Sequence, residues 1–243
     1  MEIFVERSFL DKNIQSISEN LNFNISFKKP SNTSFLQYGL NGLSFVKDLN
    51  NSQQILHVDF SKGSLGWRIK RAQHEINIKK ALGKSKDQML IFDATAGLLS
   101  DTMIFLSLGH KVIALEQSKI IYSLVQDAIF RCTNYDELFK NLEFHNADSI
   151  DFYRQKKIKS DVIYLDPMYP DSKKNAKRSG AMEVIKSILE IENFSAEAEN
   201  ILDEFRLLNY QKIILKRPLK SKKNYSNINY QVLGKATRFD IFL

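Results

Sequence analysis

Three residues that follow a short apolar run have the chemistry to hold an amino group. Asp166, Pro167 and Tyr169 come directly after residues 161–165 (DVIYL), whose length and composition predict a buried strand. Ligands of parallel sheets bind at the edge where the strands end. There the Asp166 carboxylate and a backbone carbonyl can accept hydrogen bonds from an NH₂ group, and the Tyr169 ring can stack on a base. The pattern therefore predicts capture of a nucleobase. The alternative is a loop without function, in which these residue types would follow a buried strand only by chance.

A second candidate site is residues 93–97 (DATAG), a turn of small residues between two apolar segments. Residues 89–92 predict a short buried strand, residues 102–108 carry apolar side chains at helical spacing, and residues 111–115 predict a second buried strand. Strand, turn, helix and strand in this order are the layout of a nucleotide-binding α/β fold. The elements that must position both sites are therefore strands of a parallel sheet.

The residues in and after this turn favour a cationic ligand. Gly97 lets a ligand approach the backbone because it has no side chain, and the Glu116 carboxylate at the end of the second strand can accept both hydroxyls of a ribose. A dinucleotide fold would carry G-x-G-x-x-G and a helix N-terminus free for a pyrophosphate, which disfavours a nicotinamide oxidoreductase. Here Asp101 opens the helix, repels phosphate and suits an ammonium group, such as that of S-adenosylmethionine (SAM). The alternative is an ordinary turn in which Asp93 and Asp101 are solvated caps.

The chain after Glu116 extends this pattern to a full sheet. A mostly parallel sheet with an antiparallel end is predicted, in one α/β domain that runs from residue 61 to residue 243. Asp148, after the third strand, is placed either to accept the exocyclic amine of an adenine or to cap the next helix. The predicted helices are 67–82, 118–132, 181–190 and 196–208, and the further strands are 142–144, 212–215, 231–233 and 238–242.

Residues 1–60 are predicted to form a small β-rich appendage. Residues 1–56 show no strong helical period, segments 35–38 and 43–46 flank a glycine-bearing turn as in a hairpin, and residues 54–60 predict another strand. Such an appendage can cover a sheet edge or help to hold a substrate, and both interpretations stay open.

Charge is distributed unevenly along the 243 residues, whose formal net charge is +7. Residues 61–86 contain eight basic residues and one acidic residue, residues 87–153 contain four and ten, and residues 154–243 contain eighteen and eleven. This order suits a cationic cofactor in the centre and a polyanion at the rim, whereas the alternative is that the basic side chains are only solvated. The candidate contacts to RNA phosphates are Arg68, Arg71, Lys173, Lys174, Lys177 and Arg178.

Composition excludes several other classes of protein. Hydrophobic residues make up 43% of the chain and include 17 Phe, which indicates a globular protein rather than a disordered one. The single cysteine, Cys132, allows neither an internal disulfide nor a cluster of thiolate ligands, and no metal is expected. No apolar run approaches the roughly 20 residues of a membrane span, and no signal-peptide pattern is found, so a cytoplasmic protein is predicted.

Several segments together resemble the ribosomal RNA small subunit methyltransferase J family. They are DATAGLLSD, the strand that ends at Glu116, DVIYLDPMYP, ILKRP and GKATRFDIF, and VDFSKG before them also fits. The resemblance runs in ordered blocks from about Val58 to the C-terminus. It implies a Rossmann-like, class I SAM-dependent methyltransferase that modifies the exocyclic N2 amine of a guanine in 16S rRNA. Its partner would be that rRNA or the small ribosomal subunit.

The same resemblance implies roles for single residues. Asp166 and the Pro167 carbonyl would accept the hydrogens of the target amine, and Tyr169 would stack on the base. The segment also resembles the D-P-P-Y motif of DNA amino methyltransferases, which is one alternative. A SAM-fold RNA-binding protein without turnover is another, and the intact segment from Asp166 to Tyr169 argues against it. Together with the turn residues Asp93 and Gly97, the expected SAM contacts are Ser100, Asp101, Glu116, Gln117, Asp148, Ser149 and Asp166.

Overall fold

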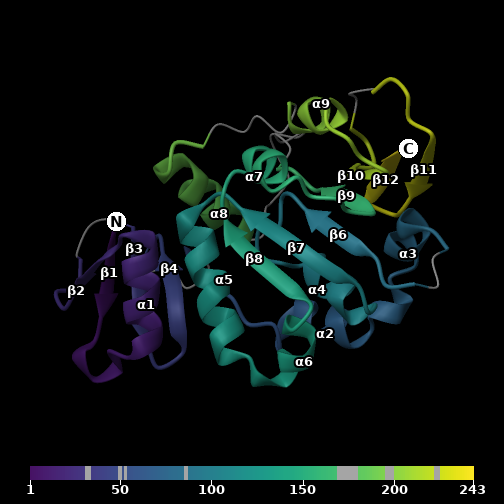
Figure 1. Cartoon of the computed structure of the whole chain (residues 1–243). Helices are drawn as coiled ribbons and strands as arrows, with labels where there is room; N and C mark the ends of the chain where they lie inside the picture. The colour runs from purple at the N-terminus through teal and green to yellow at the C-terminus, as the bar shows by residue number, and fades with distance from the viewer. Residues whose placement is uncertain are drawn as a thin grey trace. The chain divides into compact units, whose positions relative to one another are not determined.

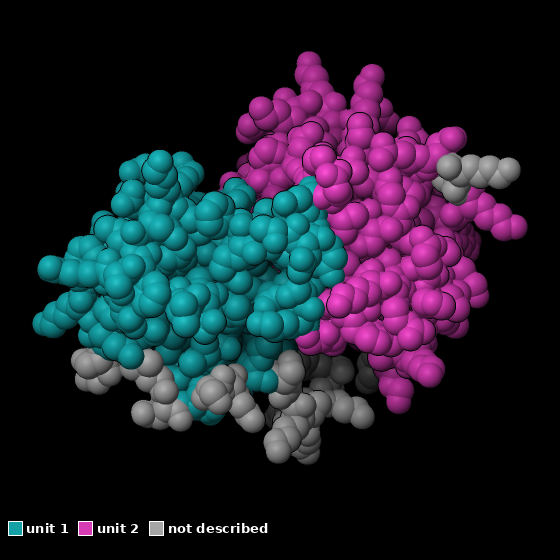
Figure 2. Space-filling model, turned by 90° about the horizontal axis from the view of Figure 1, so that it is seen from below, with its two compact units in different colours: residues 1–62, 118–136, 175–195 teal, residues 63–117, 137–174, 196–243 magenta. Residues whose placement is uncertain are grey.

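The computed structural model describes residues 1–30, 34–48, 51, 54–84, 87–168, 180–194, 200–221 and 225–243 (Figure 1). The chain forms two compact units, and each is assembled from separate stretches of sequence (Figure 2). Unit 1 comprises residues 1–62, 118–136 and 175–195, and unit 2 comprises residues 63–117, 137–174 and 196–243.

Unit 2 contains a seven-stranded sheet in the order β11-β12-β10-β9-β6-β7-β8. The pairs among β10, β9, β6, β7 and β8 are parallel, and β12 pairs antiparallel with both β10 and β11. The predicted α/β fold with a mostly parallel sheet and an antiparallel end is therefore confirmed. The strands are β6 (Leu90–Asp93), β7 (Lys111–Glu116), β8 (Leu142–Asn146), β9 (Val162–Leu165), β10 (Ile213–Pro218), β11 (Tyr230–Leu233) and β12 (Thr237–Phe242).

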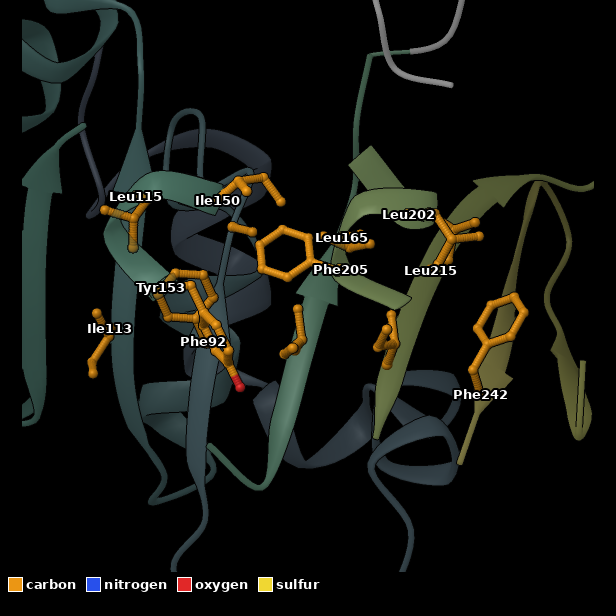
Figure 3. Packing of buried hydrophobic residues seen from close by; sticks show 13 residues of the cluster. Phe92, Ile113, Leu115, Ile150, Tyr153, Leu165, Leu202, Phe205, Leu215 and Phe242 are labelled. Carbon is orange, nitrogen blue, oxygen red and sulfur yellow. The ribbon is translucent and has the colours of Figure 1, made fainter. Parts of the chain in front are cut away.

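The central strands of this sheet are apolar between their ends, since both of their faces are buried. On one face Phe92 of β6 packs edge-to-face against Tyr153 and Phe205, with ring centroids 4.9 Å and 6.0 Å away (Figure 3). On the other face Tyr164 of β9 packs against Phe105, 4.9 Å between centroids. The helices that supply these partners are α4 (Thr102–Ser107), α7 (Ser149–Lys156) and α9 (Ile201–Arg206).

Unit 1 contains a five-stranded sheet in the order β2-β1-β3-β4-β5, together with helices from later in the chain. The predicted hairpin is present, since β3 and β4 pair antiparallel from Phe35↔Val46 to Gly39↔Gly42. The strands are β1 (Glu2–Val5), β2 (Asn24–Ser26), β3 (Phe35–Gly39), β4 (Gly42–Val46) and β5 (Ile55–His57), and the helices are α1 (Lys12–Leu21), α5 (Lys119–Arg131) and α8 (Gly180–Ile191).

The prediction that residues 1–56 show no strong helical period is wrong, because α1 lies within them. Asp11 caps this helix by accepting a hydrogen bond from the Ile14 amide at 3.0 Å. Ile14, Ile17 and Leu21 are buried at helical spacing. The polar residues between them face outward, so the segment carries a helical period that the prediction overlooked.

Asp127 on α5 joins that helix to the hairpin within unit 1. Its fully buried carboxylate accepts hydrogen bonds from the Leu43 amide at 2.8 Å, from Asn13 Nδ2 at 2.9 Å and from Arg131 Nε at 2.7 Å. Gly42 makes this approach possible, since its φ is +87° and a Cβ there would lie 2.2 Å from Arg131 Nε. The predicted domain boundary between residues 60 and 61 stays a prediction.

The predicted helix over residues 67–82 is broken into three pieces, which corrects that prediction. Two helices, α2 (Gly63–Lys70) and α3 (Ile76–Leu82), flank a 3-10 turn at Ala72–His74. The Glu75 carboxylate accepts a hydrogen bond from Arg68 Nε at 2.7 Å across this turn. The break exposes Ile76, which the unbroken helix would have buried. The remaining short helices are α6 (Asp136–Phe139) and the 3-10 turns Arg7–Phe9 and Thr133–Tyr135.

Candidate active site

Asp93 is a buried carboxylate at the end of β6. It accepts hydrogen bonds from Thr102 Oγ1 at 2.5 Å and from the Thr95 amide at 3.3 Å. Burial raises its pKa from 3.8 to about 7. The negative charges of Asp101 and Asp166 also raise this pKa, whereas the two hydrogen bonds lower it. Asp93 therefore changes its ionisation near neutral pH.

The turn after Asp93 leaves its backbone open. Gly97 has a φ of +52°, and no atom lies within 4 Å of the position that its Cβ would occupy. Thr95, two residues earlier, fixes the turn to the next strand, because its Oγ1 accepts a hydrogen bond from the Asp166 amide at 2.6 Å. The ends of β6 and β9 are thus joined beside an open stretch of backbone.

Asp101 is the most heavily bonded carboxylate in this part of unit 2. It accepts hydrogen bonds from Arg68 Nη2 at 3.0 Å, from the Tyr164 hydroxyl at 2.6 Å and from Lys216 Nζ at 2.6 Å. Burial would raise the pKa of Asp101, but the Lys216 ammonium, these hydrogen bonds and the Arg68 charge hold it below its ordinary value. Asp101 is therefore ionised at neutral pH.

Lys216 on β10 connects Asp101 to Asp166. Its ammonium also donates to Asp166 Oδ2 at 2.7 Å, and its side chain is 21% exposed. Burial would lower the pKa of Lys216, but the two carboxylates raise it above its ordinary value. Burial raises the pKa of Asp166, and Lys216 opposes this rise. The Asp166 side chain remains 37% exposed, so it is accessible while one of its oxygens is fixed.

Two functional contacts were not predicted from the sequence. In the sequence, Lys216 is noted only as part of the ILKRP segment, which gives it no role. A lysine in a buried strand needs acidic partners, and this rule indicates that Lys216 contacts acids. The other is Asn146 at the end of β8, whose Nδ2 donates to the carbonyls of Glu116 and Gln117 at 2.8 Å and 3.0 Å. It fixes the chain as it leaves β7.

The remaining predicted cofactor residues lie at the same edge of the sheet. Glu116 ends β7 and is half-buried, and Gln117 is exposed beside it. Asp148 caps α7, since its carboxylate accepts from the Asp151 amide at 2.9 Å, and Ser149 is buried as the first residue of that helix. Three of the predicted cofactor residues, Gly97, Ser100 and Asp101, lie in the segment that follows β6. All the others lie at the carboxyl ends of β6, β7, β8 and β9.

The other predicted site residues are the candidate RNA contacts and two candidate catalytic residues, Pro167 and Tyr169. Arg68 is bound to Glu75 and Asp101, as described above. Arg71 is exposed, and its guanidinium carbon lies 4.8 Å from the centroid of the Trp67 ring. Pro167 is buried next to Asp166. Tyr169, Lys173, Lys174, Lys177 and Arg178 lie outside the described residues.

Over the parts of the chain that the structure describes, no helix has both the length and the apolar composition needed to cross a membrane. The same residues contain no group of three or more His, Cys, Asp and Glu side chains arranged to hold a metal ion.

Comparison with known proteins defines the class of this protein. A family model described as "Putative SAM-dependent methyltransferase" matches residues 17–243. The fold is similar to that of the crystal structure of the SAM-dependent methyltransferase NGO1261 from Neisseria gonorrhoeae. That comparison has a TM-score of 0.75 and 22% identity, and it covers 100% of this chain and 96% of the other. The fold and the family model together define a SAM-dependent methyltransferase.

More similar sequences identify the particular family. The chain is 32% identical to the ribosomal RNA small subunit methyltransferase J of Bdellovibrio bacteriovorus, over 82% of this chain and 77% of that protein. It is 30% identical to the protein of the same name from Francisella philomiragia, over 81% and 84%, and 28% identical to that from Desulfotalea psychrophila, over 94% and 90%. The chain belongs to the ribosomal RNA small subunit methyltransferase J family.

Proposed function

We propose that this protein methylates the exocyclic N2 amine of a guanine in the 16S rRNA of the small ribosomal subunit. The names of its relatives support rRNA as the substrate. The observation that carries the proposal is the half-exposed Asp166 carboxylate at the end of β9, with Oδ2 bound to Lys216 and its amide bound to Thr95. The proposal implies a cytoplasmic location, since ribosomal subunits are assembled there.

The residues at this sheet edge fit SAM as the cofactor, which supplies a methyl group on a positively charged sulfur. An open backbone at Gly97 and a carboxylate at the end of β7 suit a nucleoside, and a cluster of acids suits a cation. Glu116 would bind the ribose hydroxyls, and Asp148 and Ser149 would bind the adenine. Ser100, Asp101 and Gln117 would complete the pocket with the Asp93 turn. Because three donors already bind Asp101, any cofactor contact of its carboxylate must share or displace one of them.

Asp166 would act by positioning the target amine. Its carboxylate and the Pro167 carbonyl accept the two amine hydrogens and so fix the direction of the nitrogen lone pair. Correct placement of two reacting groups can lower a barrier by about 7–11 kcal/mol. No strong base is needed, because the amine nitrogen can lose its proton after it has been methylated. Tyr169 would stack on the guanine, which must leave its helix if it is paired.

The test is transfer of tritium-labelled methyl groups from SAM to three substrates: 16S rRNA, 30S particles and double-stranded DNA. We expect label in the rRNA or the particle, and nuclease digestion should yield N2-methylguanosine. Label in DNA would support a DNA amino methyltransferase instead. The Asp166→Ala variant, with its fold checked by a thermal melt, should lose most of its single-turnover rate at saturating SAM. Full activity of this variant would remove Asp166 from the mechanism.

A further inference from the structure

Trp67 is an exposed indole that the proposed methyl transfer does not use. It is the single tryptophan of the chain, it lies on α2, and its relative exposure is 60%. Tryptophan is strongly buried on average, and large apolar side chains left in solvent often belong to contact surfaces. Its neighbours on α2 indicate which kind of partner this ring would contact.

The side chains around Trp67 are basic. Arg71 lies one helical turn after Trp67, and its guanidinium is 4.8 Å from the ring centroid, which is a cation–π contact. Lys70 and Arg71 are both exposed. The single acid among residues 61–86 is Glu75, and its carboxylate binds Arg68. The charge that surrounds the indole is therefore positive and complements a polyanion.

Helix α2 is tied to the candidate active site within unit 2. Arg68, the residue after Trp67, binds Asp101 at 3.0 Å, and Asp101 and Asp166 share the Lys216 ammonium. Helix α2 also packs against α4. The exposed ring and the proposed amine acceptor are thus held in one compact unit and are linked through Arg68, Asp101 and Lys216.

We propose that Trp67 and Arg71 form a stacking platform for an unpaired base of the substrate RNA. The base stacks on the indole, and Arg71 and Lys70 bind the adjoining phosphates. Stacking of splayed bases on aromatic rings and guanidinium groups is how single-stranded RNA is held. This inference rests on the proposed function and specifies the form of the substrate, a single-stranded or looped stretch near the target guanine.

The fluorescence of Trp67 tests the platform directly, because the chain has no other tryptophan. Titration with a single-stranded RNA oligonucleotide should quench this fluorescence as a base stacks on the ring. Inorganic polyphosphate, which carries charge but no bases, should bind without comparable quenching. Equal quenching by both ligands, or RNA binding without quenching, would overturn the platform.

Variants supply a second, independent measurement. Trp67→Ala should weaken binding of the oligonucleotide by about 5- to 150-fold, the range seen for loss of one stacked base, and Trp67→Phe should retain most of the affinity. Phe130→Ala is the matched control, since Phe130 is an aromatic residue on α5 that is 65% exposed, and it should leave binding unchanged. Calorimetry should show unchanged SAM affinity in all three. If Trp67→Ala does not fold, the fluorescence titration of the wild-type protein with RNA and with polyphosphate decides the question, because it needs no variant.

The platform and the proposed function fail in different ways. Unchanged RNA affinity of folded Trp67→Ala, while the wild-type protein methylates rRNA, overturns the platform alone. A wild-type protein that neither binds nor methylates rRNA overturns both.

Discussion

The Lys216 ammonium lies between two carboxylates, 2.6 Å from Asp101 and 2.7 Å from Asp166. A cation in this position favours the ionised form of both acids against the effect of burial. It also holds Asp166 Oδ2, and none of the described residues donates a hydrogen bond to Asp166 Oδ1. In the proposed reaction Lys216 is therefore a positioning residue, which leaves one oxygen of Asp166 to face the substrate.

Replacement of Lys216 by Met should lower the single-turnover methylation rate at least tenfold, because Asp166 loses the group that orients it. The pKa of Asp166 should rise further, since only the Arg68 charge then opposes the effect of burial, so the remaining activity should increase with pH over a higher range than in the wild type. Lys216→Arg should recover part of the rate. Lys212→Met is the control, because Lys212 precedes the same strand and binds the Leu82 carbonyl instead. An unchanged pH profile in Lys216→Met would contradict this role.

Glu116→Ala should weaken SAM binding by about 1–3 kcal/mol, the range for hydrogen bonds to a charged group. The fold should survive, because Glu116 is half-buried at the end of β7 rather than in the core. Isothermal titration calorimetry measures the affinity, and a thermal melt confirms folding. An unaltered SAM affinity in the folded variant would remove Glu116 from the cofactor site.

Asp93 should make the stability of the protein depend on pH. Its folded pKa of about 7 exceeds its ordinary value of 3.8, so between these values the folded chain holds a proton that the unfolded chain releases. Stability should therefore decrease as pH rises from about 4 to about 7, by at most about 1.4 kcal/mol per pH unit from this group. Urea unfolding of the wild type and of Asp93→Asn at pH 5 and pH 8 measures how much Asp93 contributes to this change in the free energy of unfolding. The stability of the wild type relative to Asp93→Asn should be lower at pH 8, and a constant difference would contradict the prediction.

Residues at the strand ends were predictable where their type was unusual for its position. Asp93, Glu116 and Asp166 are acids that directly follow apolar runs, so their location at the sheet edge followed from the strand pattern. Lys216 was missed because its role depends on two acids that are 50 and 115 residues away in sequence. A lysine in a buried strand indicates that acidic partners exist, but no local pattern shows which acids they are.

At the scale of elements, the contact between α5 and the β3–β4 hairpin depends on Asp127. Asp127→Ala should destabilise the protein by about 1–3 kcal/mol, because it leaves the buried Leu43 amide without its acceptor. Denaturant unfolding measures this loss. Glu137→Ala is the control, since Glu137 pairs with Lys140 in solvent and such pairs contribute little. Equal stability of the two variants would show that Asp127 does not hold the hairpin.

Elements with continuous apolar sequence were predicted well, and those governed by single polar contacts were not. The strands β6, β7 and β9 are mostly buried apolar runs that are too short for a helix, and their length decides the assignment. The apolar residues of segment 67–82 recur at helical spacing, but the helix is interrupted by a 3-10 turn at Ala72–His74. Period alone does not show such a turn.

At the scale of the whole molecule, the mostly parallel sheet with an antiparallel end followed from the class of fold, whereas the composition of the two units did not. Unit 1 needs residues 118–136 and 175–195 as well as the N-terminal stretch. Their association depends on long-range contacts such as those of Asp127, which composition and periodicity do not report.

A fragment of residues 1–62 should therefore not fold alone. It lacks α5, which contacts both α1 and β4, and a chain of about 60 residues buries only about 60% of its surface even when complete. Circular dichroism during heating should show no cooperative transition for the fragment, in contrast to the full chain. A cooperative melt of the fragment would contradict the claim that unit 1 needs residues 118–136 and 175–195 to fold.

During synthesis the N-terminal strands leave the ribosome well before the helix that packs on them. Residues 63–117 belong to the other unit, and at about 5–20 residues per second they take about 3–11 s to make. Through that interval the apolar side chains of α1 and β4 lack their partners on α5, and exposed surface of this kind is a target for chaperones and for aggregation. We therefore expect the yield of folded protein in a cell to depend on the rate of translation over residues 63–117 as well as on the stability of the finished fold.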